Sequence, residues 1–340
     1  MSDWRRSDTP PSLATIARAA GVSAATVSRI VNGDLGRASA DTVARVRRLV
    51  IELGYRPNHA GRSLRRQESQ IVAMLSPNLD NPAMAAIATS TENALRAAGY
   101  VMILCDTHDR PELQDEYLDA MRAQLARGYI LVSAVPSPGL AAALERDDPL
   151  VFVNRRNPFG GGAFVGIDNR AAGAAVADHL IDAGLNDLAC VGPEQPSATI
   201  RERIEGFIAR AAERGIAPER IRRATGTGPT HLDVGHAAVT ALVANGGWPQ
   251  ALMCPSDLIA YAAYRVASED GIAVPQDCRI VGIDGNLFNA WIAPWLASVA
   301  IPYRDFGPVV VEQLLARWAG APAGDRILPH RLVAAALPRR

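Results

Sequence analysis

Hydrophobic positions between Leu13 and Gly33 recur at helical intervals in two short runs. The apolar positions are Leu13, Ile16, Ala17 and Ala20 in the first run and Val27, Ile30 and Val31 in the second. Ser12 and Ser23 stand where helix N-caps are expected, and Gly21 suits the tight turn between the helices because glycine tolerates a positive φ. The spacing therefore predicts a helix-turn-helix.

A third amphipathic stretch, residues 40–53, completes a small three-helix core, with Ser39 before it and Gly54 after it. The outward face of the second helix carries short polar side chains and one arginine, which suit insertion into a DNA major groove. We expect DNA contacts from this face, namely Ser23, Ala24, Ala25, Thr26, Ser28, Arg29 and Asn32. Taken alone, the pattern also fits a surface helical hairpin without a partner.

The segments that flank this domain are polar. Residues 1–11 contain no apolar region of the kind found in a signal peptide, and we expect a disordered arm there. We assign residues 12–56 to the DNA-binding domain and residues 57–69 to a hinge. Pro57 prevents continuation of the preceding helix, and Gly61 lowers the helix propensity of the segment that follows. We therefore expect this basic segment, with the single large apolar residue Leu64, to become helical only on a partner. An ordinary solvated linker is the alternative.

From residue 70 onwards, short apolar runs alternate with helical patterns. The expected strands are 71–76, 101–105, 129–133, 150–154, 188–191, 251–254, 279–283 and 298–301. The expected helices are 83–98, 111–126, 138–146, 170–183, 200–214, 233–245, 257–270 and 305–318. This alternation predicts an α/β body of two lobes with doubly wound parallel sheets and a ligand cleft at the carboxyl ends of their strands.

We expect the chain to cross between the lobes near residues 160–165, 284–290 and 300. The body domain would span residues 70–340. Its first lobe would hold about residues 70–160 and 286–300, and its second lobe about residues 165–284 and 302–335. The run Gly160-Gly161-Gly162 fits a flexible connector at the first crossing better than a phosphate loop, since no phosphate-binding motif surrounds it.

Charge is distributed unevenly along the chain, although its 35 basic residues balance its 35 acidic ones. Residues 1–66 carry 12 arginines against five acidic residues, a balance of +7 that leaves −7 on the remainder. A basic head on an acidic body is what DNA binding by one domain requires. All basic residues are arginines, which suit bidentate contacts to phosphate and guanine.

The four cysteines, Cys105, Cys190, Cys254 and Cys278, stand singly in or beside expected strands. We interpret them as buried thiols in a reducing cytoplasm. The sequence contains no apolar stretch long enough to span a membrane, no metal-ligand spacing and no dinucleotide fingerprint. We therefore predict a cytoplasmic protein, associated with the nucleoid when bound to DNA, without a cofactor or a metal.

Three motifs occur in an informative order: LATIARAAGVSAATVSRIVNG, then GYRPNHAGRSLRR, then IVAMLSPNLDNP. In this the chain resembles the lactose-repressor and galactose-repressor family of bacterial transcription regulators, and the resemblance extends to about residue 335. It implies a homodimer that binds near-palindromic double-stranded operator DNA. It also adds Tyr55, Asn58, Arg62 and Leu64 to the expected DNA contacts, with Leu64 as a wedge in the minor groove.

The resemblance further implies a body similar to periplasmic sugar-binding proteins, which binds a small, carbohydrate-like effector between its lobes. The residues that match the family's cleft are Asp80, Asn154, Arg203, Ser256 and Asp284. Arg203 begins an R-x-x-G-aromatic motif, and an arginine beside a carboxylate suits a polyhydroxylated ligand. For Arg203 a surface ion pair with Glu202 or Glu205 is the alternative, and for Asp284 a turn position before Gly285.

The sequence departs from the family at several positions. Asn154 stands where many members carry Asp, Thr230-His231 where many carry an aromatic residue, and Ser256-Asp257 where many carry Asn-Asp. A cluster of Phe288, Trp291 and Trp295 could stack on a sugar, although packing is the more common role of such a group. These differences leave the effector open.

The leading hypothesis is thus a ligand-responsive repressor. A solute-binding protein without a regulatory role is the alternative, and an enzyme on a doubly wound fold is disfavoured because no catalytic motif is present.

Overall fold

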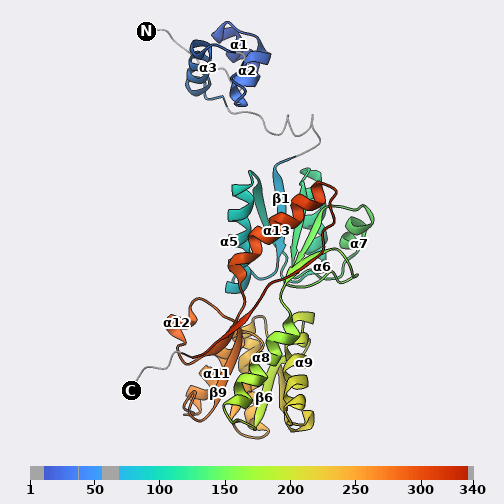
Figure 1. The fold of residues 1–340 in the computed structure, drawn as a ribbon, viewed down its shortest axis with the longest axis vertical. Coiled ribbons are helices and arrows are strands. Elements are labelled where there is room, and N and C mark those ends of the chain that lie inside the picture. The colour runs from blue at the N-terminus through green and yellow to red at the C-terminus, as the bar shows by residue number, and fades with distance from the viewer. Residues whose placement is uncertain (1–10, 37, 56–68, 336–340) are drawn as a thin grey trace. The chain divides into compact units, whose positions relative to one another are not determined.

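The computed structural model describes residues 11–36, 38–55 and 69–335, which form two compact units divided between Ser69 and Gln70. The first unit contains α1 (Leu13–Ala20), α2 (Ala24–Val31) and α3 (Ala40–Glu52) (Figure 1). The expected helix-turn-helix is confirmed. The arm at 1–10 and the hinge at 57–68, with Asn58, Arg62 and Leu64, lie outside the described residues.

Local chemistry explains where these three helices begin. Ser12, Ser23 and Ser39 are the N-caps, and each side-chain oxygen accepts a hydrogen bond from the backbone N–H three residues later. Gly21 ends α1 with a φ of 64°, in the left-handed region. Val27, Ile30 and Val46 are buried with the apolar face of α1, so three short helices share one core.

The first lobe of the second unit is built on a parallel sheet with the order β11-β5-β4-β3-β1-β2 within residues 69–335. Its strands are β1 (Ile71–Ser76), β2 (Val101–Asp106), β3 (Gly128–Val132), β4 (Leu150–Val153), β5 (Ala163–Gly166) and β11 (Asp325–Ile327). Two helices, α5 (Pro82–Ala97) and α13 (Tyr303–Trp318), cover one face (Figure 1). On the other face lie α6 (Pro111–Ala123) and α7 (Pro138–Glu145).

The second lobe repeats this plan with the strand order β12-β10-β9-β8-β6-β7 in the described chain. Its strands are β6 (Leu188–Pro193), β7 (Arg222–Gly226), β8 (Ala251–Met253), β9 (Arg279–Asp284), β10 (Ala297–Ala300) and β12 (Arg331–Val333), of which β12 runs antiparallel to β10. Helices α8 (Asn169–Asp182) and α9 (Ala198–Glu213) cover one face. The other face carries α10 (His231–Ala244) and α11 (Asp257–Glu269). The short η1 (Pro218–Arg220) precedes β7, and α12 (Asn289–Ile292) lies between β9 and β10.

The predicted lobe boundaries require correction. β10 pairs with β9 in the second sheet, so residues 286–300 belong to the second lobe and there is no crossing at 284–290. After β10 the chain crosses near 301–302 to α13, which packs on α5, and β11 then joins the first sheet. Hence 303–327 belongs to the first lobe. Strand and helix periodicity is the same in both lobes, so it cannot say which sheet a strand joins.

The first crossing also lies later than predicted. β5 pairs with β4 in the first sheet, and the chain leaves that lobe only between Gly166 and Asn169. Gly160, Gly161 and Gly162, all with φ between 69° and 85°, form the turn that leads into β5 and not a connector between lobes. β5 escaped prediction because it is only four residues long and follows directly on these glycines.

Candidate functional site

The outward face of α2 is available for contact. Ser23, Ala24, Ala25 and Arg29 are exposed, and the Arg29 side chain makes no hydrogen bond or ion pair within the described part of the chain. Thr26 and Ser28 are half-buried, and their hydroxyls lie near Ser23 Oγ (2.9 Å) and Asn32 Nδ2 (3.4 Å), respectively. Arg29 is therefore the group on this face whose hydrogen-bonding capacity is unused. Tyr55 is half-buried against the three-helix core.

In the second unit, an interlobe cavity of about 270 Å³ opens between the carboxyl ends of the two sheets. The first lobe contributes Asn78, Asn81, Asp109, Ser133, Asn154, Arg155 and Tyr303 to its lining, and the second contributes Gln195, Ser197, Thr199, Arg203, His231, Ser256 and Asp284. Four of the five predicted effector residues thus line one cavity. Asp80 does not line it and is exposed, next to Asn81, whose side chain caps α5.

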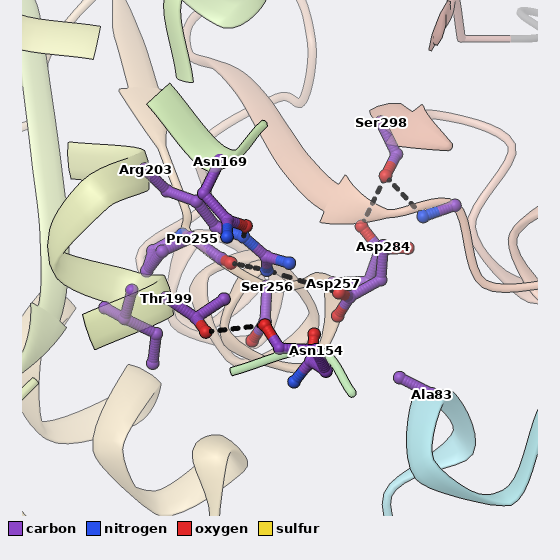
Figure 2. Close-up of polar contacts among 12 residues, drawn as sticks. Ala83, Asn154, Asn169, Thr199, Arg203, Pro255, Ser256, Asp257, Asp284 and Ser298 are labelled. Atoms are coloured by element: carbon purple, nitrogen blue, oxygen red, sulfur yellow. Dashed lines mark hydrogen bonds and ion pairs between the residues drawn. The ribbon is translucent and has the colours of Figure 1, made fainter. Parts of the chain in front are cut away.

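Arg203 lies at the centre of the second-lobe wall and is only 4% exposed. Its guanidinium donates to the Pro255 carbonyl (2.8 Å), to Asn169 Oδ1 (3.1 Å) and to Asp284 Oδ1 (3.3 Å) (Figure 2). The alternative of a surface pair with Glu202 or Glu205 is wrong: Glu205 pairs with Arg170, and Glu202 accepts from Asn169. Three protein acceptors hold the Arg203 charge in place before any ligand arrives.

The R-x-x-G-aromatic motif explains this placement. A Cβ on Gly206 would lie 2.1 Å from the Arg170 carbonyl oxygen of α8, and one on Gly173 of α8 would lie 1.9 Å from the Arg203 carbonyl oxygen. The two helices therefore approach backbone to backbone at these glycines. Phe207 is fully buried beside this contact, so the motif fixes α9 on α8 and directs Arg203 into the cavity.

Asp284 ends β9 in a strained conformation. Its φ is 146°, which an L residue rarely adopts, and it is followed by Gly285 with a φ of 65°. Tyr303, which sequence reasoning missed, donates from its hydroxyl to Asp284 Oδ1 at 2.8 Å. Burial raises the pKa of Asp284, and the Arg203 charge opposes that shift. Because Tyr303 begins α13, this bond joins the two lobes.

Asp257 lies directly behind Asp284. It is buried and accepts hydrogen bonds from Asn286 N (2.8 Å), Asn289 Nδ2 (2.9 Å) and Ser298 Oγ (2.6 Å). Burial and the neighbouring Asp284 carboxylate raise the pKa of Asp257 to about 6. These contacts hold the β9–α12 loop, and no pattern in the sequence marked Asp257 as more than a departure from the family.

On the first-lobe wall, Asn154 follows β4 with a φ of 65°, and its side chain donates to Ser133 Oγ at 2.8 Å. Ser133, at the end of β3, also has a positive φ of 57°. The Asn154 carbonyl accepts from the Thr199 hydroxyl of α9 at 3.3 Å, which gives a second bond between the lobes (Figure 2). Strained residues at neighbouring strand ends are typical of ligand-binding positions.

His231 and Ser256 form the remaining polar pair. His231 Nδ1 lies 3.1 Å from Ser256 Oγ, which also caps α11 by accepting from the Ile259 N–H. Burial, and then the Arg203 charge, lower the pKa of His231, which keeps its ring neutral near neutral pH. A neutral imidazole can both donate and accept hydrogen bonds.

The aromatic cluster does not line the cavity. Trp295 stacks on Tyr264 with ring centroids 4.2 Å apart, whereas Phe288 and Trp291 are 48% and 84% exposed. The stacking hypothesis therefore has no support in this structure. The four cysteines are buried and free, as expected. Across the described ranges, no group of histidine, cysteine and acidic residues could hold a metal ion, and no helix is long and apolar enough to cross a membrane.

Comparisons with known proteins agree with this architecture. Residues 12–58 match the family described as "Bacterial regulatory proteins, lacI family", and residues 177–335 match "Periplasmic binding protein-like domain". An uncharacterized HTH-type transcriptional regulator from the aml 5' region of Streptomyces limosus is 34% identical over 321 residues, which cover 90% of this chain and 87% of the relative.

Two solved structures are similar over nearly the whole chain. The lac repressor dimer bound to operator and the anti-inducer ONPF has a TM-score of 0.85 and 23% identity, and the match covers 97% of this chain and all of that one. The transcriptional regulator CelR in complex with cellobiose has a TM-score of 0.69 and 26% identity, with 95% and 98% of the two chains covered.

Proposed function

The chain belongs to the lacI family of bacterial regulatory proteins and is a DNA-binding transcriptional regulator, and from this premise we propose that it is a repressor whose DNA affinity is set by a polyhydroxylated small molecule in the interlobe cavity. The single observation that carries the proposal is the cavity itself. Its wall places Arg203, Asp284, Asn154 and Ser256 around one space of about 270 Å³, which is the size of a small ligand.

We propose that α2 enters the major groove of the operator and that Arg29 makes the principal base contact. The supporting observation is that Arg29 is exposed and has no partner among the described residues, whereas Ala24 and Ala25 offer only apolar contact, such as to a thymine methyl. Thr26, Ser28 and Asn32 would assist at bases or phosphates. Leu64 keeps its proposed role as a minor-groove wedge, on sequence grounds alone.

We propose a homodimer, since one recognition helix per subunit is suited to a near-palindromic site. Two exposed apolar surfaces of the second unit support it. One is the α12 region, with Leu287 (58%), Trp291 (84%) and Ile292 (67%) exposed, and the other is the edge strand β2, with Val101 (60%) exposed. Side chains of this kind are typical of interfaces between subunits. Such a protein would act in the cytoplasm, at the nucleoid.

DNA binding is tested by fluorescence anisotropy on a duplex selected from a random library. We expect Arg29→Ala to lose most discrimination between the selected and a scrambled duplex, because an arginine–guanine pair contributes about 1–3 kcal/mol. Arg45→Ala removes the same charge from α3, where Arg45 pairs with Asp41, and serves as the matched control. Equal losses in the two variants would contradict base recognition by Arg29.

Effector binding is tested by a thermal-shift screen of sugars, sugar derivatives and nucleosides, followed by a DNA titration with each compound that binds. A ligand that binds without altering the affinity for DNA would favour the alternative of a solute-binding protein. A ligand that alters it would exclude that alternative, because a ligand shifts an equilibrium only when it prefers one state.

A further inference from the structure

A second space, the side cavity of about 460 Å³, adjoins the interlobe cavity and shares Asn154, Arg155 and Thr199 with it. Three arginines line the side cavity, namely Arg155, Arg156 and Arg201, and Glu202 is the acidic residue in its lining. Glu202 already accepts a hydrogen bond from Asn169. Among the residues that line this space, basic side chains therefore outnumber acidic ones.

The three arginines differ in how fully they are bonded. Arg156 Nη1 lies 2.5 Å from Asp325 Oδ2, and its guanidinium lies 4.4 Å from the centre of the Phe164 ring, so it has partners of its own. Arg201, in the first turns of α9, makes no hydrogen bond or ion pair with the residues described. It is exposed and lines the side cavity.

Arg155 lies where the two cavities meet and is poorly satisfied. Its Nη1 contacts Asp109 Oδ1 and the Ala134 carbonyl, both at 3.4 Å, which is well beyond the about 2.7–2.9 Å of a strong charge-assisted hydrogen bond. Its Nε is buried and has no hydrogen-bond partner among the described residues. A donor left unpaired is unfavourable, so this guanidinium, whose side chain is 18% exposed, retains donor capacity for an acceptor supplied by a ligand.

We propose that the effector is an anion, a polyhydroxylated molecule whose carboxylate or phosphate is bound by Arg155 and Arg201 in the side cavity while its hydroxyls reach Arg203, Asp284 and Asn154. This inference rests on the proposed effector role of the interlobe cavity and adds the chemical class of the ligand. The shared lining residues make the geometry possible, because a ligand that passes Asn154 and Arg155 occupies both spaces. Arg203 is less available for the anionic group, since besides its ion pair with Asp284 it donates to the Pro255 carbonyl and to Asn169 at 2.8 and 3.1 Å.

The test is calorimetry on the full-length protein with matched pairs of ligands, gluconate against glucose and phosphorylated ribose against ribose. We expect at least one anion to bind about tenfold or more tightly than its neutral counterpart, as charge-assisted hydrogen bonds would give. Added salt should weaken binding of the anion more than that of the neutral sugar. Gluconate and phosphorylated ribose separate a carboxylate from a phosphate as the anionic group.

Variants locate the anion. Arg201→Gln changes an exposed helix position, so the variant should fold normally. We expect it to weaken binding of the anion about tenfold while leaving the affinity for the neutral sugar unchanged. Arg155→Gln should act in the same direction. Arg220→Gln removes an exposed arginine from η1, beyond the far end of α9, and is the charge-matched control.

The outcomes separate this inference from the proposed function. The anion site would be overturned if both members of each pair bound with equal affinity. It would also be overturned if Arg201→Gln and Arg220→Gln lowered the affinity for the anion equally. Either result would leave the proposed effector sensing intact. If no member of either pair binds, the result would count against both proposals. DNA binding by the same preparation is the control that shows the protein to be active.

Discussion

On the second-lobe side of the interlobe cavity the charged groups are bonded to one another, whereas on the first-lobe side much hydrogen-bonding capacity is unused. Arg203 donates to three acceptors and Asp284 accepts from Arg203 and Tyr303. By contrast, Arg155 makes two contacts at 3.4 Å, and its buried Nε has no partner in the described part of the chain. The second-lobe wall is therefore pre-formed, and the first-lobe wall has more to gain from a ligand.

The contrast has a structural origin. Arg203 stands on α9, which α8 holds at a glycine contact, whereas Asn154 and Arg155 stand on the segment after β4, and Asn154 has a positive φ. A helix fixed by close packing positions a side chain more rigidly than a loop does. We expect substitutions on the second-lobe wall to lower stability, and those on the first-lobe wall to lower ligand affinity.

Removing Arg203 is the strongest test of this difference. Because Arg203→Ala leaves Asp284 buried without its cation, we expect the free energy of unfolding to fall by about 3–5 kcal/mol, measured by urea denaturation. Arg220→Ala, which removes an exposed arginine, should change stability by less than about 0.5 kcal/mol.

A double variant separates charge from packing. Arg203→Met with Asp284→Asn removes both charges, and we expect it to recover part of the stability that Arg203→Ala loses. A double variant as unstable as Arg203→Ala would show that the buried pair is not the source of the loss.

The glycine contact between α8 and α9 gives the next largest effect. Gly206→Ala would place a Cβ 2.1 Å from the Arg170 carbonyl, so the two helices must separate. We expect a loss of about 1–3 kcal/mol in unfolding free energy despite the better helix propensity of alanine. Ala209→Ser, at an exposed position of the same helix, is the control and should cost less than about 1 kcal/mol. Similar losses in both variants would argue against close helix approach as the cause.

The sequence was sufficient where function follows from local spacing. The caps at Ser12, Ser23 and Ser39 and the turn at Gly21 are each decided within a few residues, so the helix-turn-helix was predicted in detail. The R-x-x-G-aromatic motif indicated Arg203 through the family resemblance. Its partnership with Asp284, 81 positions later, could not be derived from spacing, since it depends on which strands join the second sheet.

The remaining site residues were missed for the same reason. Tyr303 reaches Asp284 only because the chain returns to the first lobe at α13, a crossing that strand periodicity did not assign correctly. Asp80 was favoured by its position after the first strand, but the turn that ends in the Asn81 cap leaves it exposed. Pairing between distant segments, which is set by tertiary packing, is what a local pattern does not contain.

The buried carboxylate behind the second-lobe wall predicts a dependence on pH. The pKa of Asp257 is raised to about 6 from the ordinary aspartate value of 3.8, so the folded state binds its proton more tightly than the unfolded state does. This group therefore contributes stability that is present below pH 4 and is lost as the pH rises through 6, at up to about 1.4 kcal/mol per pH unit. We expect the difference in unfolding free energy between the wild type and Asp257→Asn to shrink from pH 4 to pH 6.5.

That difference isolates Asp257 from carboxylates that titrate in the opposite direction. Denaturation at a series of pH values measures it, and a constant difference across the range would mean that Asp257 ionises normally.

The smallest effect is expected on the outer surface of the same helix pair, where Asp178 of α8 faces Arg210 of α9 and Arg214, the C-cap of that helix. Partial burial alone would raise the pKa of Asp178, but hydrogen bonds from the two arginines outweigh it and hold that pKa below its usual range. The carboxylate is one-third exposed, so solvent screens the interaction, and we expect Asp178→Asn to cost no more than about 1 kcal/mol at neutral pH. The cost should diminish in 1 M salt, as measured by urea denaturation.

If the glycine contact rather than surface charge holds α9 in place, Asp178→Asn should also leave ligand affinity unchanged, whereas Gly206→Ala should weaken ligand binding by moving Arg203. A loss of ligand affinity in Asp178→Asn comparable to that in Gly206→Ala would show instead that the ion pairs position the second-lobe wall.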